Sequence, residues 1–388
     1  MTRTRGRVLA IDGDTAVVRS ELYDVRVTNA PRVWKPGDHV ELESQQVIRA
    51  HGDTPAPGAE VTRMPRKRVD LLRARARALA KTREVFAQRG FLEVETPLLV
   101  PAPGLEIHLD AVPAGAGYLI TSPEYQMKRL LASGFEKIYQ VCKCFRANER
   151  GAHHSSEFTM IEWYRAFDSL DAIIDDTEQL VAEVCHSLSG KPEARVNGRT
   201  IDVTPPWRRM TVRDAMSEYA GVHVDGAESA ADLIRELRGW GIECAPDAAW
   251  DDAFFAAFLA RVEPAIAALP HAVILHDWPT PLAALARTRP DDPKTALRFE
   301  AYIGGIELAN AFDELTDATE QRTRFLSDQE TRRARSKPVY PLDEKLLAAL
   351  AEGLPPSAGI ALGFDRLVML ATGADRIDDV LTFSSDEL

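Results

Sequence analysis

Two strand-like segments, residues 139–146 and 157–165, are separated by a polar loop of ten residues, and no other feature constrains the fold of this chain as strongly. Segments of this kind joined by a polar loop predict a long antiparallel hairpin. Because side chains alternate between the two faces of a strand, four residues of the second segment share one face. They are Phe158, Met160, Glu162 and Tyr164.

Glu162 is the unusual member of this face. An ordinary core strand would not place a carboxylate between Met160 and Tyr164 without a partner, because burying an unpaired charge costs several kcal/mol. The alternative for this segment alone is a half-solvated strand face. The hairpin therefore predicts either a functional face with a partnered Glu162 or a strand face open to water.

A second hairpin is predicted at Gly304-Gly305, because two adjacent glycines between strand-like runs favour a two-residue turn. With this turn, Tyr302 pairs with Glu307 and Glu300 pairs with Ala309. Glu300 and Glu307 then lie on one face as diagonal neighbours, roughly 7 Å apart, which is close enough to share a divalent cation. We therefore expect a metal site at Glu300 and Glu307.

The spacing of Glu307 and Glu314 raises a difficulty for a single binding face. The two residues are an odd number of positions apart, so strict alternation would point them to opposite faces. A bulge or a strand end must intervene, and the sequence does not locate it. Further along, Gly359–Arg366 has small residues where a strand meets a helix. This leaves room for a nucleotide and brings Arg366 to it.

Residues 1–53 alternate in short runs separated by Gly, Asp and Pro turns, which predicts a small β-barrel of the oligonucleotide-binding type. Its charges are nearly balanced, and the whole chain has a net charge of −12, so a broad nucleic-acid surface is disfavoured. Residues 54–65 are rich in proline and read as a linker. An amphipathic helix is predicted from Arg66 to about Gln88, and further helices at about 169–188, 212–219, 228–239, 251–268 and 343–352.

These segments resemble the three motifs of class II aminoacyl-tRNA synthetases, in the same order. Residues 91–97 are similar to motif 1, 145–165 to motif 2 and 359–366 to motif 3. Within this class, residues 121–129 and 305–316 resemble the corresponding segments of lysyl-tRNA synthetases. The resemblance is nearest to the short lysyl-tRNA synthetase paralogues that attach β-lysine to a lysine of elongation factor P.

The resemblance implies an α+β fold, in which a class II type antiparallel sheet is flanked by helices and residues 66–388 form the catalytic domain. It also implies a homodimer that uses ATP and Mg²⁺ to activate a lysine-like amino acid as its adenylate. No apolar stretch approaches the length of a membrane span, and the N-terminus lacks the apolar core of a signal peptide. We therefore expect a cytoplasmic protein without membrane contact.

The same resemblance implies roles for individual residues. Arg146 and Arg366 would be the catalytic arginines that hold the phosphates of ATP, and Glu300 with Glu307 would bind magnesium. The residues implied for ATP are Arg146, Asn148, Glu149, His154, Ser155, Phe158, Glu307, Leu308, Gly363 and Arg366. Those implied for the amino acid are Ser122, Glu124, Tyr164, Asn310, Phe312, Glu314 and Ala361.

The chain departs from the family pattern at three places. The usual Arg-x-Glu becomes Arg146-Ala147-Asn148-Glu149, so Glu149 or Asn148 must supply the adenine contact. Where the family has His-Asn-Pro-Glu-Phe, residues 154–158 are His-Ser-Ser-Glu-Phe. Ser155 thus replaces an asparagine whose side-chain amide contacts ATP in the family. Ala311 replaces a glycine, and its methyl group is expected to narrow the amino-acid pocket beside Asn310 and Phe312.

Three functions follow from the sequence. A ligase that transfers β-lysine to elongation factor P is favoured, because Ala361 matches the paralogue where the tRNA enzyme has glycine and because no full-length anticodon-binding barrel is expected. An aminoacyl ligase for tRNA or another small carrier is the alternative, and the N-terminal β-domain supports it. An inactive binding paralogue is disfavoured, since the arginines and the metal carboxylates are all present.

Overall fold

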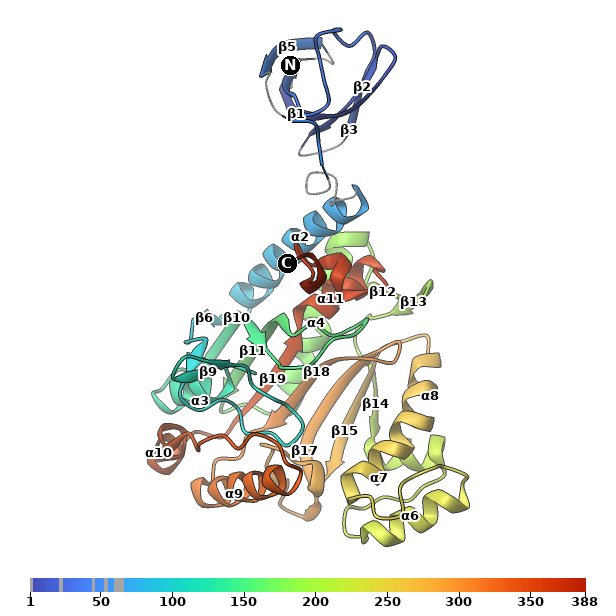
Figure 1. The fold of residues 1–388 in the computed structure, drawn as a ribbon. Helices are drawn as coiled ribbons and strands as arrows, with labels where there is room; N and C mark the ends of the chain where they lie inside the picture. The colour runs from blue at the N-terminus through green and yellow to red at the C-terminus, as the bar shows by residue number, and fades with distance from the viewer. Residues whose placement is uncertain (1–2, 21–23, 44–45, 52–54, 59–65) are drawn as a thin grey trace. The chain divides into compact units, whose positions relative to one another are not determined.

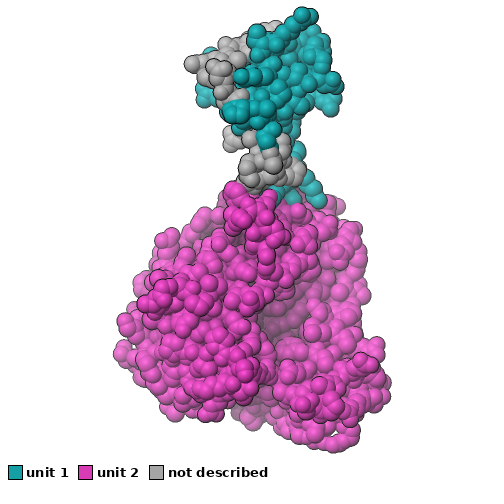
Figure 2. Space-filling view, in the orientation of Figure 1, with its two compact units in different colours: residues 1–73 teal, residues 74–388 magenta. Residues whose placement is uncertain are grey.

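The chain divides into two units that pack separately, residues 1–73 and 74–388, and the division falls within helix α2 (Arg66–Gln88) (Figure 2). The computed structural model describes residues 3–20, 24–43, 46–51, 55–58 and 66–388. Most of the predicted linker, residues 54–65, lies outside the described residues. The domain boundaries at 53 and 66 therefore stay a prediction.

The first unit holds an antiparallel sheet of five strands in the order β3-β2-β1-β4-β5. The runs of β2, β3 and β4 bury every second side chain, whereas β1 buries Val8 alone. The resulting core includes Val8, Val18, Trp34, Val40 and Leu42. The four predicted strands are present, although Tyr23, the first residue predicted for the third, lies outside the described residues. The fifth strand was not predicted. The bounds are β1 (Arg3–Asp12), β2 (Thr15–Ser20), β3 (Asp24–Val27), β4 (His39–Glu43) and β5 (Gln46–His51).

The second unit is built on a nine-stranded sheet in the order β14-β15-β17-β18-β19-β11-β10-β6, with β16 beside β17 (Figure 1). The predicted first hairpin is confirmed, since β10 pairs antiparallel with β11 and Gln140 lies opposite Glu162. Parallel pairing occurs only at β10/β6 and β14/β15 among these described pairs. The strands are β6 (Leu92–Glu93), β10 (Lys137–Phe145), β11 (Glu157–Ala166), β14 (Arg208–Thr211), β15 (Val273–Pro279), β16 (Thr288–Arg289), β17 (Asp292–Ile303), β18 (Ile306–Asp313) and β19 (Ser357–Gly363). Two smaller sheets contain β7 (Leu99–Val100), β8 (Pro113–Ala114) and β9 (Gly117–Leu119), and β12 (Glu193–Val196) with β13 (Arg199–Asp202).

Helices flank this sheet, as the α+β prediction requires. The predicted helices correspond to α2, α4 (Leu170–Ser189), α5 (Val212–Ala215) with a π-helical turn (Met216–Ala220), α6 (Ala230–Gly239), α7 (Trp250–Ala257), α8 (Glu263–Ala268) and α10 (Glu344–Gly353). The single helix predicted at 251–268 is interrupted by a π-helical turn, Phe258–Val262. Within the part of the chain that the structure describes, no helix is both long and apolar enough to cross a membrane.

Three further helices are α3 (Glu124–Ala132), α9 (Ala318–Ala334) and α11 (Phe364–Thr372). The last follows the small residues of β19, as predicted. The other two were missed. Helix α9 carries a recognisable start signal, because the Asp317 side chain accepts hydrogen bonds from the amides of Thr319 and Glu320. Helix α3 has no side-chain cap at Pro123, so the sequence carries no capping signal for its start.

The predicted register of the second hairpin is partly wrong. Tyr302 pairs with Glu307 as expected, but Glu300 pairs with Asn310 and not with Ala309. The reason is a β-bulge at Leu308, which inserts one extra residue into β18. The bulge moves the residues beyond it by one position. Glu307 therefore shares a face with Asn310 and, at alternate positions after it, with Phe312 and Glu314.

Candidate active site

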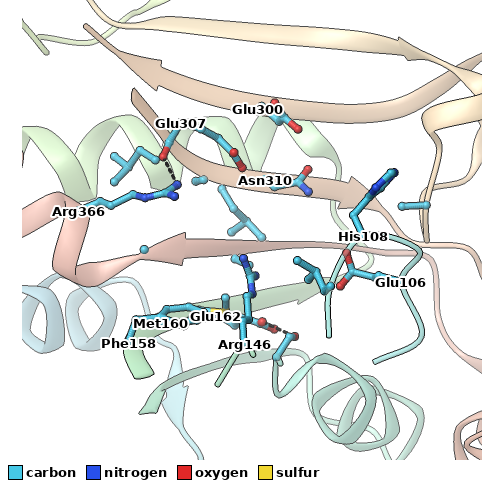
Figure 3. Close-up of a pocket in the computed structure, with 18 of the residues that line it drawn as sticks. Glu106, His108, Arg146, Phe158, Met160, Glu162, Glu300, Glu307, Asn310 and Arg366 are labelled. Carbon is cyan, nitrogen blue, oxygen red and sulfur yellow. Dashed lines mark hydrogen bonds between the residues drawn. The ribbon is translucent and has the colours of Figure 1, made fainter. Parts of the chain in front are cut away.

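A cavity of about 580 Å³ lies over the faces of β11, β17, β18 and β19 (Figure 3). Three segments outside these strands also line the cavity. They are the loop before β8, the loop of the first hairpin and the helical region from α7 to Glu263. Of the predicted site residues, only Asn148 is not among the lining residues; its backbone adopts a left-handed conformation, with φ of 64°. Glu149 does line the cavity.

Arg146 and Phe158 form one end of the cavity. The guanidinium carbon of Arg146 lies 4.9 Å from the centroid of the Phe158 ring, and one guanidinium nitrogen is 3.8 Å from a carboxylate oxygen of Glu149. The Nε of Arg146 is buried and has no hydrogen-bond partner among the residues that the structure describes. A buried donor without a partner costs free energy, which an incoming carboxylate or phosphate oxygen would recover.

Arg366 approaches the same end from the first turn of α11. Its guanidinium donates to the carbonyl of Glu307 at 2.7 Å and to the carbonyl of His153 at 3.2 Å. It also lies 2.7 Å from His154 Nε2, which must accept because arginine only donates. Burial and the adjacent Arg366 lower the pKa of His154, which keeps this imidazole neutral. These contacts fix a permanent cation in the lining of the cavity.

Glu162 lies at the closed end of the cavity. It is only 1% exposed, so the alternative of a half-solvated strand face is wrong. Ser122 Oγ donates to one carboxylate oxygen at 2.5 Å, and the Tyr164 hydroxyl donates to the other at 3.1 Å. Burial raises the pKa of Glu162 well above its usual range, and the nearby Glu124 carboxylate adds to the rise. A cationic ligand would stabilise the charged form.

Lys128 connects two more carboxylates at this end. Its Nζ lies 2.6 Å from an oxygen of Glu124 and 2.6 Å from an oxygen of Glu314, and Lys128 is 2% exposed. Burial acts to lower the pKa of Lys128, but the two carboxylates outweigh it and the pKa is raised. Two acidic side chains thus share one lysine, and Glu162 is a third buried carboxylate of this pocket. The pocket is complementary to a ligand that carries positive charge.

Lys128 and Glu162 were not among the predicted site residues. Lys128 follows Glu124 by four positions, which is the spacing of an ion pair on one helix face. That signal could not be used because α3 itself was not predicted. Glu162 was noticed as unusual in the sequence, and its buried position confirms that this face is not an ordinary one.

Glu300 and Glu307 face the cavity together and have a donor set suited to a divalent cation. Arg298 and Tyr302 both donate to the Glu300 carboxylate. Burial raises the pKa of Glu300 to about 7 against the lowering effect of Arg298, and the Glu307 carboxylate adds to the rise. A cation bound between the carboxylates would relieve this repulsion. Among the described residues no group of three or more His, Cys, Asp or Glu forms a metal site, so two carboxylates and ligand oxygens would have to suffice.

Strand β19 forms the floor of the amino-acid end. Ala361 lies between Glu162 on β11 and Asn310 on β18. Gly359 must be glycine, because a Cβ there would lie 2.2 Å from the Tyr164 ring. The expectation that Ala311 narrows this pocket is wrong. Ala311 is fully buried, is not a lining residue and points to the opposite face of the sheet from Asn310.

Comparison with known proteins places this geometry in a family. The family model described as tRNA synthetases class II (D, K and N) matches residues 61–387. A protein named elongation factor P–(R)-β-lysine ligase from Klebsiella pneumoniae (strain 342) is 38% identical over 338 residues, which are 84% of this chain and 98% of the relative. The protein of the same name from Erwinia tasmaniensis is 39% identical over 325 residues, covering 80% of this chain and 94% of the relative. One from Salmonella heidelberg (strain SL476) is 38% identical over 338 residues, with coverage of 84% and 98%.

Proposed function

This chain belongs to the class II tRNA synthetases of the D, K and N type, and from that premise we propose that it activates (R)-β-lysine with ATP and transfers it to elongation factor P. The observation that carries the proposal is the charge arrangement of the cavity. Lys128 lies between the carboxylates of Glu124 and Glu314, and Glu162 is a further buried carboxylate of the cavity. The buried Nε of Arg146 has no hydrogen-bond partner among the residues that the structure describes. A molecule with two ammonium groups and one carboxylate matches this arrangement.

Activation then proceeds mainly by positioning and charge stabilisation. Arg146 binds the amino-acid carboxylate and the α-phosphate, Phe158 stacks on adenine, and Arg366 binds the terminal phosphate. A carboxylate oxygen attacks the α-phosphorus in line, and the bond to pyrophosphate breaks, with no protein nucleophile. Glu300 and Glu307 would hold Mg²⁺, which supplies neutralisation of phosphate charge when bound.

We further propose that two copies of the chain associate in the cytoplasm. Three leucines around the segment that is similar to motif 1 support the dimer. Leu92, Leu98 and Leu99 are 51%, 38% and 56% exposed, and neighbouring exposed apolar side chains favour burial against a partner. The dimer is testable by measuring the molar mass in solution with and without charged substitutions at these leucines.

The substrate is tested by amino-acid-dependent pyrophosphate exchange across α- and β-amino acids. We expect (R)-β-lysine to give a higher kcat/KM than α-lysine. The Ala361 methyl group lies between the side chains of Glu162 and Asn310, where it should crowd the α-lysine amine. Ala361→Gly is therefore expected to shift the ratio of the two kcat/KM values toward α-lysine by about tenfold, since one carbon in a tight pocket is worth roughly 1–3 kcal/mol.

Ala311→Gly is the matched control, because it removes the same methyl group from the opposite face of the sheet and should leave the ratio unchanged. The acceptor is then identified by supplying elongation factor P or total tRNA to the enzyme-bound adenylate. A preference for α-lysine that persists in Ala361→Gly, or transfer to tRNA alone, would contradict the proposal and favour the carrier-ligase alternative.

Deleting residues 1–54 is expected to leave adenylate formation intact. The family match begins at residue 61, and no described residue of the first unit lines the cavity. Transfer to the acceptor is the step that we expect to decrease, because residues before the family match have no role in activation. Pyrophosphate exchange and acceptor labelling on the purified truncated protein measure the two steps separately. Loss of exchange in a folded truncated protein would show that this sheet contributes to activation.

A further inference from the structure

We propose that His108, oriented by Asp251, is the general base that deprotonates the acceptor amine in the transfer step. This inference rests on the proposed function, because it requires an enzyme-bound adenylate and an amine acceptor. The activation step described above gives neither residue a role. Both are therefore free for a second chemical step at the same cavity.

His108 belongs to the loop between β7 and β8 and lines the cavity. Its Nε2 lies 3.4 Å from an oxygen of Asp251 on α7. Arg335 holds the same carboxylate through contacts of 3.2 and 3.0 Å. With Nε2–H directed at Asp251, the proton-free nitrogen of a neutral His108 is Nδ1, which forms no hydrogen bond within the described part of the chain. The pair has the arrangement of an oriented base.

The position of His108 matches the route that an acceptor must take. Figure 3 shows Phe158 and Arg366 on one side of the cavity and Glu106 and His108 on the other. The adenylate would occupy the nucleotide side and the closed pocket, where Glu162 and Glu314 are each 1% exposed. The acceptor must therefore enter from the remaining side, where the His108 side chain is 54% exposed.

The walls of this entrance suit a lysine side chain. Leu259, 56% exposed, offers an apolar surface to the methylene chain, and the Asp252 side chain is also 56% exposed and carries negative charge. The charged groups around His108 come from three parts of the chain. They are Asp251 and Asp252 from α7, Asp328 and Arg332 from α9, Arg335 directly after α9, Glu106 and Asp110 in the loop of His108, and Lys337, whose Nζ donates to the His108 carbonyl. The carboxylates outnumber the cations, so an ammonium group is attracted to the entrance.

The chemistry balances without any additional reactant. The acceptor ammonium gives one proton to His108 Nδ1 and becomes a neutral amine. Its lone pair attacks the carbonyl carbon of the adenylate, a C–N bond forms, and the C–O bond to phosphate breaks with its electron pair leaving on AMP. The second proton of the amine passes to water as the amide forms, and the proton on His108 follows it to solvent.

The test compares acceptors that differ in their need for a base. In single-turnover reactions of the enzyme-bound adenylate, His108→Ala and His108→Gln are expected to slow transfer to elongation factor P by about 100-fold, within the range for loss of a general base. Transfer to n-butylamine, which is protonated at neutral pH, should slow similarly. Transfer to hydroxylamine, which is already neutral, should change less than about threefold. Pyrophosphate exchange should be unchanged in both variants.

His223→Ala is the control, because His223 is an exposed histidine that does not line this cavity. Asp251→Asn should slow transfer to n-butylamine more than transfer to hydroxylamine. Equal slowing with both amines would mean that His108 only shapes the entrance, and an unchanged rate with elongation factor P would overturn the inference directly. If the wild type forms no β-lysyl adenylate, the proposed function fails instead; the two amines then test His108 with whichever adenylate it forms.

Discussion

Replacing Arg366 or Arg146 by alanine is expected to lower amino-acid-dependent pyrophosphate exchange by about 10²- to 10³-fold, the loss expected for one charged contact to a transition state in a site screened from water. The larger loss is expected for Arg146→Ala, because the buried Nε of Arg146 has no partner in the described part of the chain. Arg366 is anchored by the carbonyls of His153 and Glu307, which hold its charge in place.

Arg150→Ala is the matched control for both variants. Arg150 belongs to the same hairpin loop, but its side chain is 55% exposed and pairs with Asp386 at the surface. Its removal should change exchange by less than about twofold, because surface ion pairs contribute little. Circular dichroism and thermal unfolding of all three variants check that the fold persists. Near-normal exchange by Arg366→Ala or Arg146→Ala would refute the assignment of this end of the cavity to ATP.

Replacing Lys128 by methionine is expected to lower the free energy of unfolding by about 3–5 kcal/mol, the cost of leaving a buried charge without its partner. Methionine keeps the length of the side chain, so packing changes little. The substitution leaves Glu314, 1% exposed, and Glu124 without their shared cation. Chemical denaturation of the purified variant measures the change in the free energy of unfolding.

Two further variants separate the charge effect from general damage. Adding Glu314→Gln to Lys128→Met removes one of the uncompensated carboxylates, so the double variant should be more stable than Lys128→Met alone. Lys143→Met removes the lysine of a surface pair, since Lys143 and Glu157 are 42% and 57% exposed, and should cost less than about 1 kcal/mol. A similar decrease in the free energy of unfolding for Lys128→Met and Lys143→Met would show that Lys128, Glu124 and Glu314 do not form a buried charge network.

The local patterns of the sequence predicted both hairpins of the large sheet and how the first hairpin pairs. Alternation placed Phe158, Met160, Glu162 and Tyr164 on one face, and the structure pairs β10 with β11 over that whole segment. The Gly304-Gly305 turn was also predicted, because its conformation depends on the two residues that form it. Three motif-like segments in order indicated the family, which the comparison confirmed.

Only the tertiary structure decided how those faces meet. The bulge at Leu308 is one residue of backbone that brings Glu307 to the same face as Glu314, and no side chain in the sequence marks it. The contact of His108 with Asp251 and that of Lys128 with Glu314 join residues far apart in the chain. Periodicity acts over a few neighbouring residues, whereas the burial and partners of a charge depend on which distant segments pack around it. The sequence therefore predicted many of the residues of the site, but not Lys128, Glu162 or His108. The packing of the sheet, loops and helices decided which charged groups contact one another.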